Sequence, residues 1–123
     1  MKLRLIGIDT PETHDPRKPV QCFGAEASAQ ATKMLAGRRV LVETDPTQGT
    51  QDRYGREPVY VWTIGGQLFN LDMIRLDFAH EYTYDLPYRY RDAFIAAERD
   101  ARTAGRGLWA GDTCDGNTTK PAG

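Results

Sequence analysis

The first eight residues, MKLRLIGI, form a β-prone segment that runs into a loop where regular structure cannot continue. The next stretch, DTPETHDPRKPV, holds three prolines and several turn-forming residues. Side chains alternate between the two faces of a strand, so Arg4 and Asp9 cannot point the same way along an unbroken one. Gly7 is the natural place for a bulge. The sequence therefore predicts a strand that breaks near Gly7 and ends in a polar site.

Beyond this loop, helical and strand-like segments follow one another without internal repeats. Composition and periodicity predict helices at 23–36, 70–78 and 88–104. β-branched and aromatic residues predict strands at 38–44 and 59–64 and a short extended piece at 80–84. Helices that cover one face of such a small sheet make an α+β domain.

Local signals also mark the helix ends. Asn70 is expected to cap the second helix through its side chain. Gly105 stands where the third helix should stop, and Glu98 and Arg102 form an i,i+4 ion pair within it. One face of the third helix is expected to carry Tyr90, Phe94, Ala97, Ala101 and Ala104.

Length and charge limit the classes of protein that this chain can belong to. A chain of 123 residues is the size of one domain. No apolar run reaches the roughly 18 residues of a membrane span. The formal net charge is −1, so phosphate binding would require basic residues gathered at one place.

The chain has two cysteines, Cys22 and Cys114, one near each end. Their spacing matches no zinc-ligand pattern, and His14 and His80 are not placed to complete one. The spacing leaves two alternatives open. The cysteines are two isolated buried thiols, or they form a disulfide that closes most of the chain and indicates an oxidising compartment.

The stretch RLIGIDTPE gathers groups that suit a metal and a phosphate. The carboxylates of Asp9 and Glu12, with the Thr10 carbonyl, could bind one hard cation through oxygen. Arg4 could bind a phosphate with two hydrogen bonds. Taken alone, the stretch is more typical of a strand that ends in a capped turn with surface ion pairs.

The stretch QDRYGREPVYVW presents two arginines and an aromatic ring just before a strand. Arg53 and Arg56 could neutralise phosphate oxygens, Tyr54 could stack on a base, and Gly55 allows close backbone approach. Alone it is a generic basic turn. Together the two stretches hold the groups that phosphodiester hydrolysis requires: carboxylates for a metal, a carboxylate that can act as a base, and separate arginines.

The chain carries, in this order, RLIGIDTPE, an alanine-rich helix, DRYGR, a β-strand, EYTY and a helix closing on GLW. This order resembles the thermonuclease family, typified by staphylococcal nuclease. The match runs from Arg4 to about Trp109, and QCFGAEAS and GLWAGDTC resemble secreted bacterial members. The resemblance implies a five-stranded OB-type β-barrel with three helices and Ca²⁺-dependent hydrolysis of DNA and RNA. It also implies a Cys22–Cys114 disulfide and a secreted or cell-envelope location.

The resemblance assigns chemical roles by motif. Arg4 and Arg56 would clamp the scissile phosphate and stabilise the charge of the transition state. Glu12 would be the general base that draws a proton from the attacking water. The Asp9 carboxylate and the Thr10 carbonyl would bind the calcium ion.

It also assigns substrate contacts. Arg53 and Tyr54 fall where the family contacts a terminal phosphate of the nucleotide. Tyr82 and Tyr84 match tyrosines around the bound base and phosphate. From the residues alone, these two tyrosines are ordinary core or surface aromatics.

The main departure from the family lies at the beginning. Family members carry a hairpin before this strand, with a DGDT-like segment whose aspartate binds calcium, whereas this chain starts at MKLRL. We therefore expect an N-terminally truncated domain at 1–110 and a polar tail at 111–123. An incomplete barrel has exposed strand edges that favour self-association. With one direct carboxylate, calcium binding should be weak, unless Asp45, Asp52 or a carboxylate from a partner chain replaces the missing ligand.

Two classes of function follow. The retained arginines and Glu12 favour a calcium-dependent nuclease. The missing hairpin favours a non-catalytic nuclease-like module that binds nucleic acid or protein. In neither case is a membrane partner expected.

Overall fold

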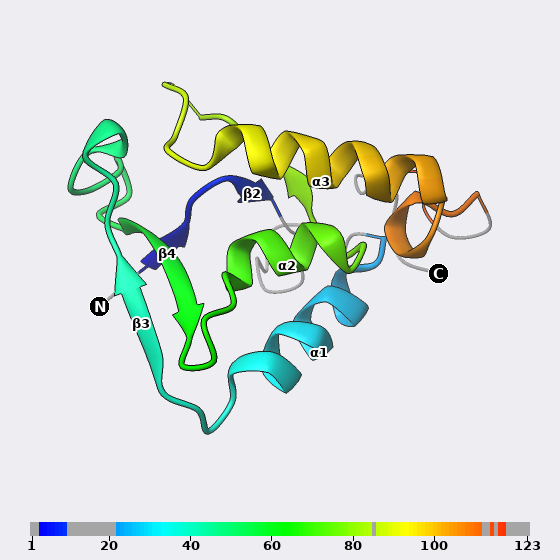
Figure 1. Cartoon of the computed structure of the whole chain (residues 1–123), viewed down its shortest axis with the longest axis horizontal. Helices are drawn as coiled ribbons and strands as arrows, with labels where there is room; N and C mark the ends of the chain where they lie inside the picture. The colour runs from blue at the N-terminus through cyan, green and yellow to red at the C-terminus, as the bar shows by residue number, and fades with distance from the viewer. Residues whose placement is uncertain (1–2, 10–21, 85, 112–113, 115, 118–123) are drawn as a thin grey trace.

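The computed structural model describes residues 3–9, 22–84, 86–111, 114, 116 and 117. Over these residues the chain is an α+β protein with three α-helices and five short strands (Figure 1). The helices are α1 (Gly24–Leu35), α2 (Phe69–Arg75) and α3 (Arg91–Ala104). The strands are β1 (Leu3–Leu5), β2 (Ile8–Asp9), β3 (Val40–Glu43), β4 (Glu57–Thr63) and β5 (His80–Glu81). Two 3₁₀ turns, Pro46–Gln48 and Gly107–Trp109, complete the secondary structure of this part of the chain.

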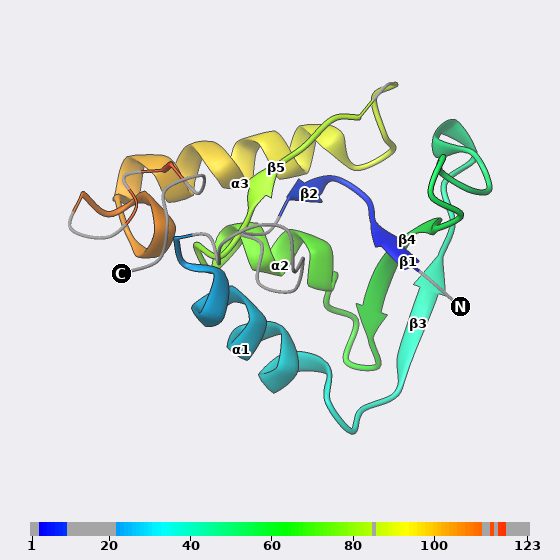
Figure 2. The same ribbon diagram turned by 180° about the vertical axis from the view of Figure 1, so that it is seen from behind.

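The strands form two small sheets. β4 is the centre of the larger one, parallel to β1 and antiparallel to β3, and β2 pairs with β5 in the other. Figure 2 shows β1 beside β4, with β2 continuing toward β5. Among the described residues these sheets do not close into the barrel that the resemblance implies.

The predicted break in the first strand is confirmed. Gly7 separates β1 from β2 and has a φ of +85°, a conformation that side chains rarely adopt. A Cβ atom at Gly7 would lie 2.5 Å from the ring of Phe94 and 2.8 Å from the ring of Tyr88. Glycine is therefore required here both by the backbone conformation and by the close packing of α3.

The core lies where the helices pack against β4. The views in Figures 1 and 2 place α2 between α1 and α3. Tyr60 of β4 is fully buried and meets the rings of Tyr90 and Phe94 edge-on. Phe69, Met73 and Ile74 of α2 fill the same core. Burial of this apolar surface is the main term that stabilises the fold.

The expectation that Asn70 caps α2 is wrong. The N-cap is Leu68, and Asn70 lies inside the helix, fully buried. Its side-chain oxygen accepts a 2.9 Å hydrogen bond from the Val61 N–H. Its amide donates to the carbonyls of Ile6 (2.9 Å) and Val59 (3.2 Å). Asn70 thus joins α2 to the strand β4 and to the end of β1 through hydrogen bonds to buried backbone groups.

The other helix signals are mostly confirmed. Arg102 and Glu98 pair at 2.8 Å, and α3 stops at Gly105, which has a φ of +64°. Phe94 and Ala101 of the predicted apolar face are buried, but Ala104 is exposed because it lies in the last turn, beyond the core.

The Cys22–Cys114 disulfide is confirmed. The two Cα atoms lie 5.9 Å apart and the sequence separation is 92 residues. The bond joins the residues just before α1 to those after Gly107–Trp109. None of the helices in the described part of the chain is long and apolar enough to cross a membrane.

Candidate functional site

An open polar groove lies alongside β1, at the end where β4 begins. It has a volume of about 480 Å³ and is lined by Leu3, Arg4, Leu5, Ile8, Asp9, Arg56 and Tyr82. Four of the residues that the sequence assigned to a site therefore reach one groove. They come from three separate stretches of the sequence, and the pairing of the strands brings them together.

The parallel pairing of β1 with β4 places the two arginines together. Arg4 is in register with Pro58, and Arg56 is the residue just before β4, two positions ahead of Pro58. The pairing therefore brings Arg4 and Arg56 to the same end of the sheet, where both line the groove. Arg4 is half-buried, and the Arg56 side chain is 41% exposed.

Asp9 reaches this groove because the chain turns at Gly7. The exposed Asp9 is the last residue of β2 and is in register with His80 of β5. Thr10 and Glu12, which the resemblance assigns to calcium binding and to proton abstraction, lie outside the described residues.

Two tyrosines stand beside Arg4. The guanidinium carbon of Arg4 lies 5.0 Å from the ring centroid of Tyr84 and 5.9 Å from that of Tyr82. The Tyr82 N–H donates a 2.8 Å hydrogen bond to the Gly7 carbonyl, which fixes this segment against the break between β1 and β2. Both rings are about half exposed, 44% for Tyr82 and 55% for Tyr84. The arrangement offers one cation and two aromatic faces to a ligand in the groove.

The turn before β4 carries the second cation and a third ring. The Tyr54 ring, 63% exposed, lies 5.0 Å from the Arg53 guanidinium carbon and 5.5 Å from that of Arg56. Arg53 also donates a 3.0 Å hydrogen bond to the Tyr54 hydroxyl. Gly55 has a φ of +76°, and no other group lies within 4 Å of a Cβ at this position. Gly55 is therefore required by the turn itself rather than by packing.

Sequence reasoning missed the role of Asp52. One of its carboxylate oxygens accepts the N–H groups of Tyr54 and Arg56, both at 2.9 Å. The other oxygen accepts the Nε–H of Arg56 at 2.7 Å. The available signal was an aspartate at the start of a turn, since the Asp side chain commonly accepts the backbone N–H two residues further on.

Burial of Asp52 would by itself raise the pKa of its carboxyl. The hydrogen bonds from the N–H groups of Arg56 and Tyr54, together with the charge of the Arg56 guanidinium, outweigh this effect. The pKa of Asp52 is therefore lowered, and the carboxylate is charged at neutral pH.

Of the calcium ligands that the resemblance implies, only Asp9 lies among the described residues. Asp9 supplies a hard oxygen donor of the type that Ca²⁺ prefers. No group of three or more His, Cys, Asp or Glu side chains is found in the part of the chain that the structure describes. The Asp52 carboxylate forms an ion pair with Arg56, so it is not placed as the replacement calcium ligand considered from the sequence.

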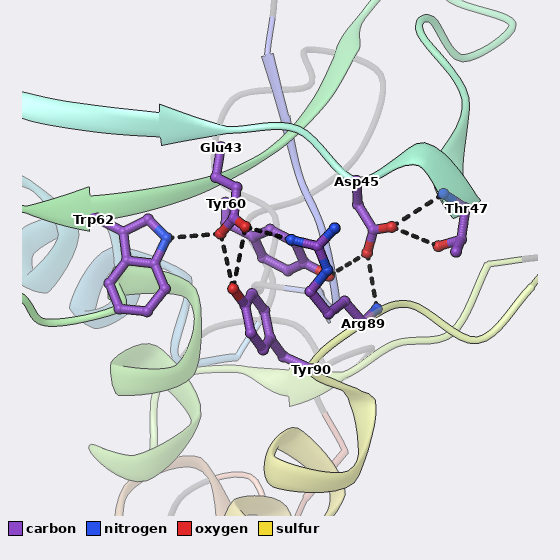
Figure 3. Close-up of polar contacts among 7 residues, drawn as sticks. All are labelled: Glu43, Asp45, Thr47, Tyr60, Trp62, Arg89 and Tyr90. Carbon is purple, nitrogen blue, oxygen red and sulfur yellow. Dashed lines mark hydrogen bonds and ion pairs between the residues drawn. The ribbon is translucent and has the colours of Figure 1, made fainter.

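The Asp45 carboxylate is also occupied by hydrogen bonds within the protein. It is 1% exposed and accepts hydrogen bonds from the hydroxyl of Tyr60 (2.7 Å), from the Arg89 N–H (2.8 Å) and from Thr47. Figure 3 shows these contacts, which tie the loop after β3 to β4 and to the segment before α3. Asp45 is therefore a structural carboxylate and not a calcium ligand.

The neighbouring carboxylate has the same structural role. Glu43 accepts hydrogen bonds from the Trp62 ring N–H (2.9 Å), the Tyr90 hydroxyl (3.0 Å) and the Arg89 guanidinium (2.7 Å) (Figure 3). Both carboxylates thus fix the start of α3 against the β3–β4 pair.

Comparison with known proteins decides the family. The model of the family described as staphylococcal nuclease homologue matches residues 2–111. The chain belongs to this family. Two curated thermonucleases, from Staphylococcus hyicus and Staphylococcus intermedius, are each 36% identical to it over 108 residues. The endonuclease YncB of Bacillus subtilis is 28% identical over 109 residues.

The chain spans only part of these relatives. The alignments cover 88% of this chain, but 62% of each thermonuclease and 51% of YncB. Membership of a nuclease family follows from these matches, and an OB-like fold is what the family implies. The residue roles, the metal and the substrates of this chain are matters for proposal.

Proposed function

We propose that the protein is a nuclease that hydrolyses phosphodiester bonds of DNA and RNA with the help of Ca²⁺. The observation that carries the proposal is that Arg4, Arg56 and Asp9 line one groove. Two fixed cations at a groove suit a phosphodiester, whose charge grows in the transition state of hydrolysis. The nuclease relatives support the same reaction class.

The proposed role of the two arginines is to bind the scissile phosphate. Arginine presents a planar fork of donors that can bind two phosphate oxygens at once. Arg4 approaches the groove from β1 and Arg56 from the turn just before β4, so a phosphate between them would be held on two sides. Preorganised donors of this kind need no reorientation as charge develops on the phosphate oxygens.

The calcium ion and the base are proposed on the family resemblance. The Asp9 carboxylate and the Thr10 carbonyl would hold the ion, and Glu12 would accept the proton of the attacking water. A bound divalent ion supplies charge neutralisation and makes a coordinated water more acidic.

The proposed role of the aromatic rings is to contact the remaining parts of the nucleotide. Tyr82 and Tyr84 stand beside Arg4, where the flanking base or phosphate would lie. Arg53 and Tyr54 flank Arg56 and would contact a neighbouring phosphate. Stacking of bases on exposed rings tolerates any sequence, which suits a nuclease with broad substrates.

The location and assembly are part of the proposal. A disulfide is stable in an oxidising environment, so the Cys22–Cys114 bond supports a secreted or cell-envelope protein. The division into a nuclease domain at 1–110 and a tail at 111–123, and self-association through strand edges, stay predictions.

The test is a cleavage assay on single-stranded DNA and RNA with Ca²⁺, with EDTA, and with Arg56→Lys. Cleavage should require Ca²⁺ and should fall by about 10²–10³ in kcat in the lysine variant, because a point charge cannot replace the guanidinium fork. Arg75→Lys, a substitution in an exposed ion pair of α2, is the control that should leave cleavage unchanged. Full activity in EDTA or in Arg56→Lys would refute the proposal, and binding of nucleic acid without any cleavage would favour a non-catalytic module.

A further inference from the structure

The guanidinium of Arg56 is fixed at its Nε edge by a carboxylate. Its Nε–H is bound by Asp52 at 2.7 Å. Among the residues that the structure describes, no hydrogen bond occupies its two terminal amino groups, although the side chain lines the groove. The contact with Asp52 uses the Nε edge alone, and the Arg56 side chain lines the groove.

The carboxylate that holds Arg56 is itself fixed more firmly than an ordinary surface aspartate. The Asp52 side chain is 8% exposed. Its other oxygen is bound by two backbone N–H groups, those of Tyr54 and Arg56. Its backbone N–H donates to the Arg56 carbonyl at 2.8 Å, and its own carbonyl accepts from Gly55 at 3.0 Å. The turn from Asp52 to Arg56 is therefore closed by both backbone and side-chain hydrogen bonds.

We propose that Asp52 is a positioning residue that orients the Arg56 guanidinium toward the substrate phosphate. The inference rests on the proposed nuclease function. It assigns a role to a residue that is not among those proposed to bind the phosphate, the calcium ion or the base. Arginine has several rotatable bonds, and fixing them before the substrate binds removes an entropic cost from the transition state. Asp52 restricts the side chain by binding the Nε–H of Arg56, so that the terminal amino groups are directed toward the phosphate.

A positioning role and a plain charge effect predict changes in different kinetic constants. Asp52 places a negative charge beside a groove for an anion, so removing that charge alone should strengthen binding of the phosphate. Loss of positioning should instead slow the reaction. Asp52→Asn is the informative substitution, because its side-chain oxygen can still accept the two backbone N–H groups that close the turn. Its NH₂ group cannot accept the Arg56 Nε–H, so only the link to the guanidinium is lost.

The experiment measures kcat and KM of the full chain on a single-stranded DNA oligonucleotide with Ca²⁺. Asp52→Asn should lower kcat by about 10- to 100-fold while KM stays equal or falls. In an Arg56→Ala background the same substitution should change kcat less than twofold, because Asp52 acts through Arg56. Asp72→Asn, which breaks the 3.2 Å ion pair with Arg75 on α2, is the matched control and should leave both constants unchanged. Thermal unfolding of each variant checks that the fold is kept.

An unchanged kcat in Asp52→Asn, or an equal loss in the Arg56→Ala background, would overturn the inference. If the wild-type chain does not cleave, the proposed function fails, and the geometry is then tested by hydrogen exchange of the Arg56 Nε–H in NMR spectra. Exchange that is slow in the wild type and at least 10-fold faster in Asp52→Asn supports the positioning contact. Equal exchange in the two proteins overturns it.

Discussion

The buried hydroxyl of Tyr60 donates a 2.7 Å hydrogen bond to Asp45, a carboxylate that is itself 1% exposed. The pair joins the central strand β4 to the loop after β3, and the Arg89 N–H adds the segment before α3. Burial would raise the pKa of Asp45, but the hydrogen bonds from Arg89, Tyr60 and Thr47 outweigh it and lower the pKa to about 2, from 3.8. Burial and the same contact raise the pKa of Tyr60, so its hydroxyl stays a donor at neutral pH.

The first prediction concerns acid stability. Because the pKa of Asp45 is lowered in the folded state, its contribution to the free energy of unfolding is full above pH 4 and is lost as the pH falls toward 2. The loss over this window should be about 2 kcal/mol. Urea unfolding of the wild type and of Asp45→Asn between pH 6 and pH 2 measures it. The stability difference between the two proteins should shrink as the pH falls, and a constant difference would contradict the assignment.

The second prediction concerns Gly7. Gly7→Ala should lower the free energy of unfolding by about 2–5 kcal/mol, since it combines left-handed strain with overpacking against Phe94. Gly37→Ala is the matched control. Gly37 has a similar φ of +69° but open space around its Cβ position, so only the strain of about 1–2 kcal/mol should remain. Equal losses in the two variants would show that the contact with Phe94 does not matter.

The third prediction concerns the disulfide. Reduction should lower the free energy of unfolding by about 2–4 kcal/mol, because the Cys22–Cys114 bond restricts the unfolded chain over a separation of 92 residues. Chemical denaturation with and without reductant measures the change. The double variant Cys22→Ser with Cys114→Ser should match the reduced protein and should not respond to reductant. Two titratable thiols in the unreduced, denatured protein would rule the bond out.

The fourth prediction concerns Tyr84. Stacking of a base on an exposed ring is worth about 1–3 kcal/mol, so Tyr84→Leu, which removes the ring beside Arg4, should weaken binding of a single-stranded oligonucleotide by about 5-fold or more. Tyr84→Phe keeps the ring and should bind like the wild type. Fluorescence anisotropy in EDTA measures affinity without cleavage. Equal weakening in both variants would assign the effect to the hydroxyl group instead.

Features that depend on neighbouring residues could be read from the sequence. The break at Gly7, the end of α3 at Gly105 and the Glu98–Arg102 pair each involve residues no more than a few positions apart. The Asp52–Arg56 contact is equally local and was open to the same reasoning, but it was overlooked among the charges of the turn. The disulfide was expected only from the family resemblance, because spacing alone left the cysteines undecided.

Features that depend on segments brought together by folding could not be read. The interpretation of Asn70 as a cap was wrong because its hydrogen-bond partners, Ile6 and Val59, come from distant strands. Asp45 was considered as a calcium ligand because nothing near it in the sequence shows that Tyr60 and Arg89 would occupy it.

The sequence by itself determined the order of the elements, where they break, and which residue types could bind a phosphate. Only the tertiary structure decided that Arg4 and Arg56 share a groove, since this depends on the parallel pairing of β1 with β4. Parallel pairing of strands more than 50 positions apart is set by how α2 and α3 pack on the sheet and by the loss of chain entropy on closing a long loop. Local patterns of residues predict neither the packing of the helices on the sheet nor the entropy of closing the loop.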